Sequence, residues 1–163
     1  MPAKLRKSPP VCFGISILRL LIGGLRISKQ YIGTSVKMED GQNFTIFRHI
    51  TSHPLKENKT ATVFIVRFKF TRLSHNANIL ASIIPMLFIA GFPGFDTKMY
   101  AVNKKNGYWQ GMYQWKSKKH LEEYKNSFVY KMINKNYKCF LYLRPDLKYV
   151  NKLNINEVLD IKR

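Results

Sequence analysis

The stretch that decides the fold is ATVFIVRFKF, residues 61–70. Its β-branched and aromatic residues are enriched in strands, so the stretch predicts a strand. Apolar side chains occupy both alternating sets of positions, with Phe64 and Phe68 in one set and Val63 and Ile65 in the other. Because successive side chains of a strand point to opposite faces, both faces of the predicted sheet need to be covered.

Downstream of this strand, the pattern predicts two helices and three more strands. In order, they are a helix over 75–84 capped by Ser74, strands over 95–102 and 108–115, a helix that Ser117 begins, and a strand over 137–143. Pro85 ends or kinks the first helix, because proline lacks the amide that the helical ladder uses. Asn106 and Gly107 accept the positive φ of a tight turn, so the two strands that they join should pair antiparallel.

This βαββαβ order over residues 60–144 predicts an α+β, ferredoxin-like fold, with a four-stranded antiparallel sheet and both helices on one face. The apolar face of the second helix is predicted from residues that recur at intervals of three and four, namely Leu121, Tyr124, Phe128 and Met132. Three alternatives are open for the other sheet face: a second copy of the chain, an N-terminal helix and hairpin, or a stacked ligand.

Residues 1–30 form a basic and apolar N-terminal segment. No acidic residue occurs before Glu39, and Arg19 interrupts an apolar run over 11–25. That run is shorter than the ~20 residues of a membrane span. We therefore expect a short helix packed on the domain, or a basic helix that lies on an anionic membrane surface through residues 11–27.

Residues 31–59 are predicted to be a β-hairpin extension followed by a linker. The hairpin comprises strands over 33–38 and 43–50, joined by the Asp-Gly turn at 40–41, a strong turn signal. At the other end of the chain, residues 145–163 read as a polar tail that is weakly ordered or forms an edge segment.

The composition limits the functional classes. Lys and Arg number 28 against 9 Asp and Glu, and the net charge of +19 attracts anionic partners such as nucleic acid or lipid headgroups. The two cysteines, Cys12 and Cys139, are too few for a disulfide scaffold and lack zinc-site spacing, so a reducing, cytoplasmic location is the default. His, Cys, Asp and Glu never cluster at ligand spacing, so no metal site is expected.

A family resemblance rests on three short motifs. They are Pro-Gly-Phe over 93–95, Lys-Met-Tyr over 98–100, and Gly-Met-Tyr-Gln-Trp-Lys-Ser over 111–117. With them, residues 60–144 resemble the dimeric α/β-barrel superfamily, and most of all its YdhR-like putative monooxygenase branch. The resemblance implies a homodimer whose two sheets pack face to face, with a pocket between sheet and helices in each subunit. It also implies a cofactor-independent monooxygenase, or a binder, of a small hydrophobic or aromatic molecule.

Three residues are candidates for lining that pocket. Trp115 lies where the superfamily often places a pocket tryptophan, and Tyr113 shares its sheet face by the two-residue period. Arg67 stands in an otherwise apolar strand and could hold an anionic group of the substrate. The structural alternatives are core packing for Trp115 and an exposed or cross-strand-paired arginine for Arg67. Cofactor-free oxygenation also needs a dry cavity and a proton acceptor, and the sequence assigns no catalytic residue to that role.

Haem and RNA are two further classes of ligand for a fold of this kind. Haem would need an axial ligand, usually His, and none of the four histidines (His49, His53, His75 and His120) lies mid-helix on an apolar face. We therefore expect surface or capping histidines and no cofactor. The RNA-recognition motif shares the βαββαβ order, but residues 106–113, NGYWQGMY, match its third-strand consensus only in part. An RNA-binding module is the alternative to the monooxygenase.

Overall fold

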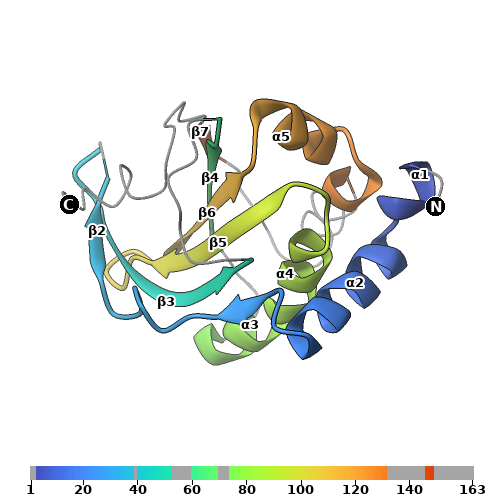
Figure 1. The fold of residues 1–163 in the computed structure, drawn as a ribbon. Coiled ribbons are helices and arrows are strands. Elements are labelled where there is room, and N and C mark those ends of the chain that lie inside the picture. The colour runs from blue at the N-terminus through green and yellow to red at the C-terminus, as the bar shows by residue number, and fades with distance from the viewer. Residues whose placement is uncertain (1–2, 39, 53–59, 70–73, 132–145, 149–163) are drawn as a thin grey trace.

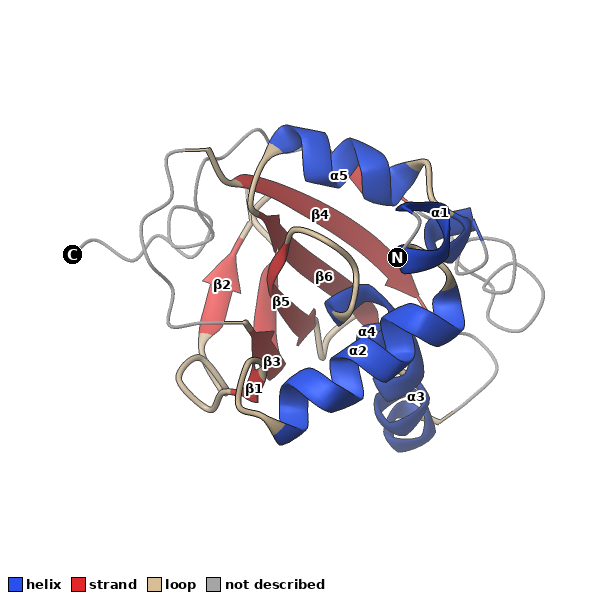
Figure 2. Ribbon diagram, turned by 45° about the vertical axis from the view of Figure 1, so that its right-hand side comes forward, coloured by secondary structure: helices blue, strands red, loops and turns tan. Residues whose placement is uncertain are grey.

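The protein is one antiparallel sheet with its helices packed on a single face (Figures 1 and 2). The computed structural model describes residues 3–38, 40–52, 60–69, 74–131 and 146–148. Its helices are α1 (Ala3–Arg6), α2 (Pro9–Leu21), α3 (His75–Ala81), α4 (Ile83–Ala90) and α5 (Lys118–Lys125). Its strands are β1 (Arg26–Ile27), β2 (Ser35–Lys37), β3 (Asn43–Thr51), β4 (Thr62–Lys69), β5 (Phe95–Val102), β6 (Tyr108–Trp115) and β7 (Asp146–Lys148).

The strand order confirms the predicted ferredoxin-like α+β fold. The sheet runs β1-β3-β5-β6-β4-β7, with β2 also paired to β3, and all pairs are antiparallel. Within it, β4, β5, β6 and β7 are the four strands of the βαββαβ unit, with the first and third strands at its centre. The predicted hairpin does not stand apart, because β3 pairs with β5 and extends the same sheet.

β5 and β6 have the predicted bounds. β5 and β6 pair antiparallel across a turn in which Gly107 has a φ of 73°. The fourth strand of the unit, β7, lies in the segment predicted to be the polar tail, at the edge beside β4. The strand predicted over 137–143 lies outside the described residues.

The first predicted helix is broken at Ser82 rather than at Pro85. Ser74 caps α3 as predicted, because its hydroxyl accepts the Ala77 amide. A second helix, α4, begins at Ile83, so Pro85 falls in its first turn, where a helix needs no amide donor.

The second predicted helix begins as expected but is shorter. The Ser117 hydroxyl accepts the His120 amide at its start, and Leu121 and Tyr124 are buried. The predicted continuation through Phe128 is wrong, because α5 ends at Lys125 and the Phe128 side chain is 65% exposed. Met132 lies outside the described residues.

The N-terminal helix α2 packs on α4, as one of the two expectations for this segment had it (Figure 2). Ser16 donates a hydrogen bond to the Leu87 carbonyl, and Arg19 donates one to the Ala90 carbonyl at 3.0 Å. At the crossing, a Cβ on Gly91 would lie 1.7 Å from the Cys12 carbonyl oxygen. The absence of a side chain at Gly91 therefore sets how closely the two helices approach.

The opposite sheet face is covered by part of the N-terminal region. Tyr31, Val36 and Phe44 are buried there in one cluster with the side chains of β4, β5 and β6 on that face, which include Val63 and Met112. Of the three proposed covers, the hairpin therefore contributes and α2 does not, because α2 lies on the helical side. The homodimer stays a prediction.

His49 lies on this second face and corrects the expectation that the histidines occupy surface or capping positions. Its side chain is buried in β3, with Nε2 at 2.9 Å from Thr97 Oγ1, and burial lowers its pKa to about 4. A neutral ring buried in this way serves packing. By contrast, His120 is bonded to the capping Ser117, His75 is exposed, and His53 lies outside the described residues.

A Gly91→Ala substitution tests the close crossing of α2 and α4. The added Cβ forces the two helices apart, and overpacking of this kind costs about 1–3 kcal/mol. Gly14→Ala is the matched control, because nothing lies within 4 Å of a Cβ there and alanine favours a helix over glycine. Urea unfolding should show a loss of stability for Gly91→Ala and none for Gly14→Ala. Equal stabilities of the two variants would contradict the tight crossing.

Candidate functional site

A lysine is enclosed between the sheet and the helices. Lys98 lies in the middle of β5 and is 1% exposed. Its neighbours across the sheet are Ile50 on β3 and Tyr113 on β6, both in the core on the helical side. No ion pair to Lys98 is found in the part of the chain that the structure describes. An unpaired buried lysine is rare, because an isolated charge is costly to remove from water.

Two tyrosine rings flank the Lys98 amine. Nζ lies 4.1 Å from the centre of the Tyr100 ring and 4.4 Å from that of Tyr113, and it donates a hydrogen bond to the Tyr100 hydroxyl. Gly111 makes room for this arrangement, since a Cβ there would lie 2.8 Å from Tyr113 Cε2. The site therefore depends on a glycine two residues before one of its own rings.

Arg48 adds a second cationic group beside Tyr100. A β-bulge at Phe47 interrupts the register of β3, and both Phe47 and Arg48 contact the Tyr100 ring. The guanidinium donates hydrogen bonds to Ser82 Oγ at 2.6 Å and to the Ile79 carbonyl at 2.8 Å. The helix break between α3 and α4 thus supplies neutral acceptors for a half-buried arginine.

The environment favours an uncharged Lys98. Burial lowers the pKa of Lys98 well below its ordinary value, and the charge of Arg48 lowers it further. The two rings attract the charged form, but cation–π contacts are worth about 0.5–2 kcal/mol, whereas burying an unpaired ion costs several. A neutral amine can accept a proton or act as a nucleophile.

The predicted pocket residues Tyr113 and Trp115 share the helical face. Trp115 is fully buried, stacked on Tyr124 at 4.6 Å and in edge contact with Phe92 and Phe95. Its Nε1 has no hydrogen-bond partner among the described residues. Tyr113 contacts Lys98. Trp115 lies two residues further along β6, and its ring packs among the aromatic side chains under α5.

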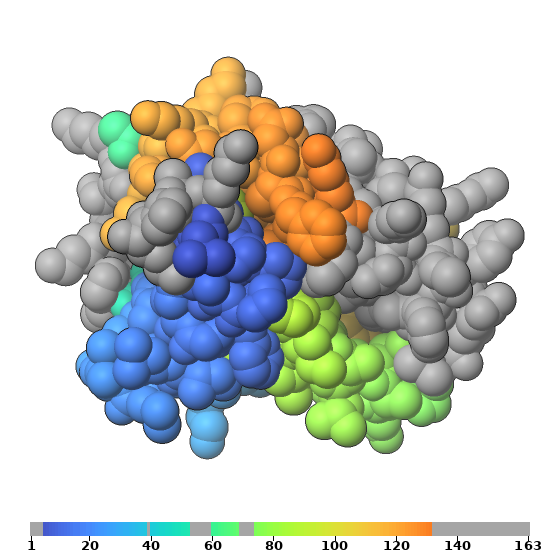
Figure 3. Space-filling view, turned by 90° about the vertical axis from the view of Figure 1, so that its right-hand side faces the viewer, coloured from blue at the N-terminus to red at the C-terminus, as the bar shows by residue number. Residues whose placement is uncertain are grey.

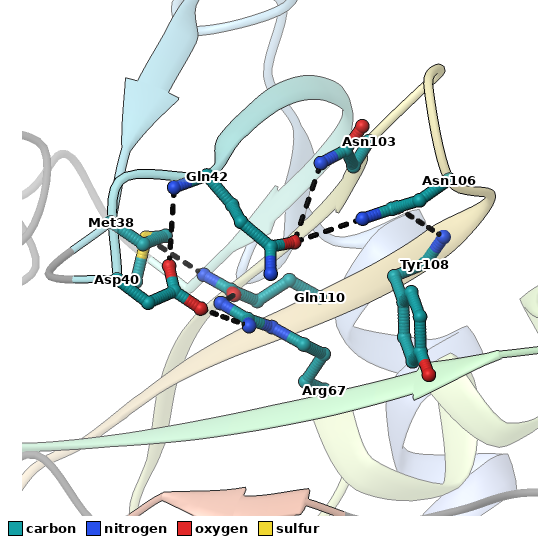
Figure 4. Close-up of polar contacts among 8 residues, drawn as sticks. All are labelled: Met38, Asp40, Gln42, Arg67, Asn103, Asn106, Tyr108 and Gln110. Carbon is teal, nitrogen blue, oxygen red and sulfur yellow. Dashed lines mark hydrogen bonds and ion pairs between the residues drawn. The ribbon is translucent and has the colours of Figure 1, made fainter.

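Arg67 lies on the opposite sheet face, away from the other two candidates. Its guanidinium forms an ion pair with Asp40 of the hairpin turn and donates a hydrogen bond to Gln110 Oε1 at 3.3 Å (Figure 4). It also lies 4.8 Å from the centre of the Phe44 ring. These contacts match the cross-strand-paired interpretation of this arginine.

The Arg67 contacts belong to a polar network between two turns (Figure 4). The Gln42 side-chain oxygen accepts hydrogen bonds from Asn103 at 3.4 Å and from Asn106 at 3.0 Å. The network joins the turn at 38–42 to the turn at 103–107. It fastens the hairpin to the sheet, which is a structural role.

Sequence reasoning missed Lys98 and Arg48 as site residues. The available signal was the two-residue period, which places Lys98 and Tyr100 on the face that the predicted helices cover. Arg48 carried no such signal, because the bulge shifts its register. No three His, Cys, Asp or Glu side chains come together as metal ligands within the described ranges.

The fold and the site define a ferredoxin-like α+β protein with a buried lysine between two tyrosines. No protein-family model and no curated protein matches the chain. Three solved structures are similar to it. A putative monooxygenase from Lactobacillus acidophilus NCFM is 14% identical, with a TM-score of 0.47 over 61% of this chain and 47% of that one. Another from Fusobacterium nucleatum is 13% identical, with a TM-score of 0.49 over 68% and 54%. An anthrone oxidase-like protein is 15% identical, with a TM-score of 0.47 over 61% and 49%. The chain spans about half the length of these structures.

Lys98→Met tests the protonation state of the buried amine. Between its lowered folded pKa and the ordinary value of 10.5, the unfolded chain binds the proton and the folded chain does not. The stability of the natural protein should therefore rise with pH through that window, by about 1.4 kcal/mol per unit of pKa depression. Lys98→Met should be the more stable protein at neutral pH, with the difference shrinking toward pH 10.5.

Denaturant unfolding across this pH range measures the effect. Lys104→Met, at an exposed lysine, is the matched control and should follow the natural protein at every pH. A Lys98→Met variant that does the same would show that Lys98 is charged in the folded state.

Proposed function

We propose that the protein binds a small aromatic molecule with an acidic C–H group at Lys98, Tyr100 and Tyr113, and oxidises it with dioxygen without a cofactor. The observation that carries the proposal is the buried Lys98 amine between two aromatic rings, with no ion pair among the described residues. Aromatic side chains favour a flat aromatic ligand, and a few polar groups among them fix its orientation.

Lys98 and Arg48 have complementary roles in this reaction. The neutral Lys98 amine accepts a proton from the substrate carbon, as a general base. The resulting carbanion is conjugated with a carbonyl, and the Arg48 guanidinium stabilises the negative oxygen. Exclusion of water strengthens both effects, because charges interact more strongly in a medium of low dielectric constant.

Dioxygen is the sole oxidant in the proposed reaction. The carbanion transfers electrons to dioxygen and a C–O bond forms, giving a peroxide that takes up the proton from Lys98. Loss of water from the peroxide leaves a carbonyl at the former methylene carbon. One oxygen atom enters the product, the other leaves as water, and Lys98 returns to its neutral form.

The substrate reaches Lys98 by displacing the junction between α3 and α4. Arg48 fastens that junction through Ser82 Oγ and the Ile79 carbonyl. When the guanidinium binds the substrate oxygen instead, those two hydrogen bonds are exchanged for a charge-assisted one. Loops and helix ends that move in this way commonly gate enzyme sites.

The family resemblance supports the same residues. The motifs at 98–100 and 111–117 contain Lys98, Tyr100, Gly111 and Tyr113, which together form the cluster. Membership of the dimeric α/β-barrel superfamily and of its YdhR-like branch are part of this proposal. A homodimer is proposed only through another surface, because Tyr31, Val36 and Phe44 bury the sheet face that would meet a partner.

The geometry does not favour the RNA-binding alternative. An RNA-recognition motif stacks bases on the sheet face that carries no helices. In this chain, Gln110 and Met112 of β6 lie on that face and are buried, and Tyr31, Val36 and Phe44 share the cluster with Met112. That face is therefore occupied by the protein itself.

Anthrone is a suitable probe, because its methylene group is flanked by two rings and loses a proton to give a stabilised anion. Oxygen uptake and anthraquinone formation should both be catalysed by the natural protein. Lys98→Met should lower the rate by about 10²-fold or more, the usual contribution of a general base. The rate should also rise with pH through the lowered pKa of Lys98, because only the neutral amine accepts the proton.

Two controls keep the test specific. Lys104→Met removes an exposed lysine by the same substitution and should leave the rate unchanged. Binding is followed separately by quenching of tryptophan fluorescence, since Trp109 packs against Tyr100 with ring centres 6.4 Å apart. Binding without oxygen uptake would reduce the function to that of a binder, and unchanged oxidation by Lys98→Met would remove the lysine from the mechanism.

A further inference from the structure

The outward face of α2 is apolar, although it faces solvent. Leu21 is 79% exposed and Ile22 71%, and Ile17 and Leu18 are exposed on the preceding turn. A surface helix normally carries polar residues on the side away from the core. The opposite side of α2 packs on α4, so packing within the chain does not explain the outer side.

More apolar side chains are exposed in neighbouring elements. Ile27 of β1 is exposed, and so are Leu80 and Ile84 at the junction of α3 and α4. Figures 1, 2 and 3 place α3 and the C-terminal end of α2 at the same end of the molecule, and Figure 3 shows the residues of α2 in blue adjoining those of α3 and α4 in green. We call Ile17, Leu18, Leu21, Ile22 and Ile27 the apolar edge. Exposed large apolar side chains that gather on one helix and the strand after it indicate an interaction site.

The positive charge of the segment around the apolar edge favours an anionic partner. Arg26 and Lys29 are exposed in the segment that follows α2, and neither forms an ion pair among the described residues. No acidic residue occurs before Glu39, and the chain carries a net charge of +19. A second copy of the chain would bring like charges together, whereas a surface of anionic lipid attracts them.

We propose that the apolar edge, with Arg26 and Lys29, docks the protein on the surface of an anionic lipid bilayer. Leu21 and Ile22 enter the boundary between headgroups and acyl chains, and the two cations contact lipid phosphates and carboxylates. α2 has 13 residues, and no helix in the described part of the chain is long and apolar enough to cross a membrane. The helix therefore lies along the surface.

Co-sedimentation with vesicles tests this docking. The natural protein should sediment with vesicles that contain phosphatidylserine and much less with vesicles of phosphatidylcholine alone. The double variant Leu21→Gln/Ile22→Gln should lose binding by about tenfold or more, because two exposed apolar side chains no longer enter the bilayer. Phe128→Gln is the matched control, an exposed apolar residue beyond the apolar edge, and should bind like the natural protein.

A second pair of variants separates local charge from overall charge. Arg26→Gln/Lys29→Gln should weaken binding about 30-fold, which corresponds to ~1 kcal/mol for each charge near the surface. Lys104→Gln/Lys105→Gln removes the same charge at the turn between β5 and β6 and should weaken it far less. Equal effects of the two pairs, binding to both kinds of vesicle alike, or full binding by Leu21→Gln/Ile22→Gln would overturn the proposal.

Sedimentation velocity without lipid distinguishes the other occupant. A dimer of the natural protein that Leu21→Gln/Ile22→Gln converts to a monomer would assign the apolar edge to a second copy of the chain. Circular dichroism and thermal unfolding confirm that each variant is folded before binding is compared. None of these measurements depends on the proposed oxidation.

Discussion

The register of β5 against β6 is the constraint on which the rest of the structure depends. It places Lys98 opposite Tyr113 and Tyr100 opposite Gly111, all on the helical side. Because side chains alternate, a slip of one residue would move Lys98 and Tyr100 to the face where Met99 and Ala101 now lie. The turn ending at Gly107, with its positive φ, fixes the register and with it the position of the buried amine.

The sequence predicts what local chemistry controls. The bounds of β5 and β6 follow from alternation and a glycine turn, and the starts of α3 and α5 follow from the capping serines Ser74 and Ser117. What it does not predict depends on contacts between distant segments. The cover of the second sheet face is one example, since it depends on how the hairpin packs. The partner of Arg67 is another, because Asp40 lies 27 residues away in the chain.

The candidate site illustrates the same limit. The position of Tyr113 in a strand predicts it as a site residue. The sequence does not predict its neighbour Lys98, because no local pattern indicates whether a lysine in a strand reaches water. Only the packing of α4 over β5, with α2 on α4, decides that. A buried unpaired amine lowers the stability of the fold, and groups of that kind are commonly retained where they serve a reaction.

Gly111, two residues before Tyr113, restricts which substitutions the lysine site tolerates. Any side chain at position 111 would occupy space that the Tyr113 ring now fills. The two positions are therefore sterically coupled, and a larger residue at 111 requires a smaller or displaced side chain at 113. Since that ring forms one wall of the lysine site, the identity of residue 111 in a homologue indicates whether the arrangement around Lys98 can be retained.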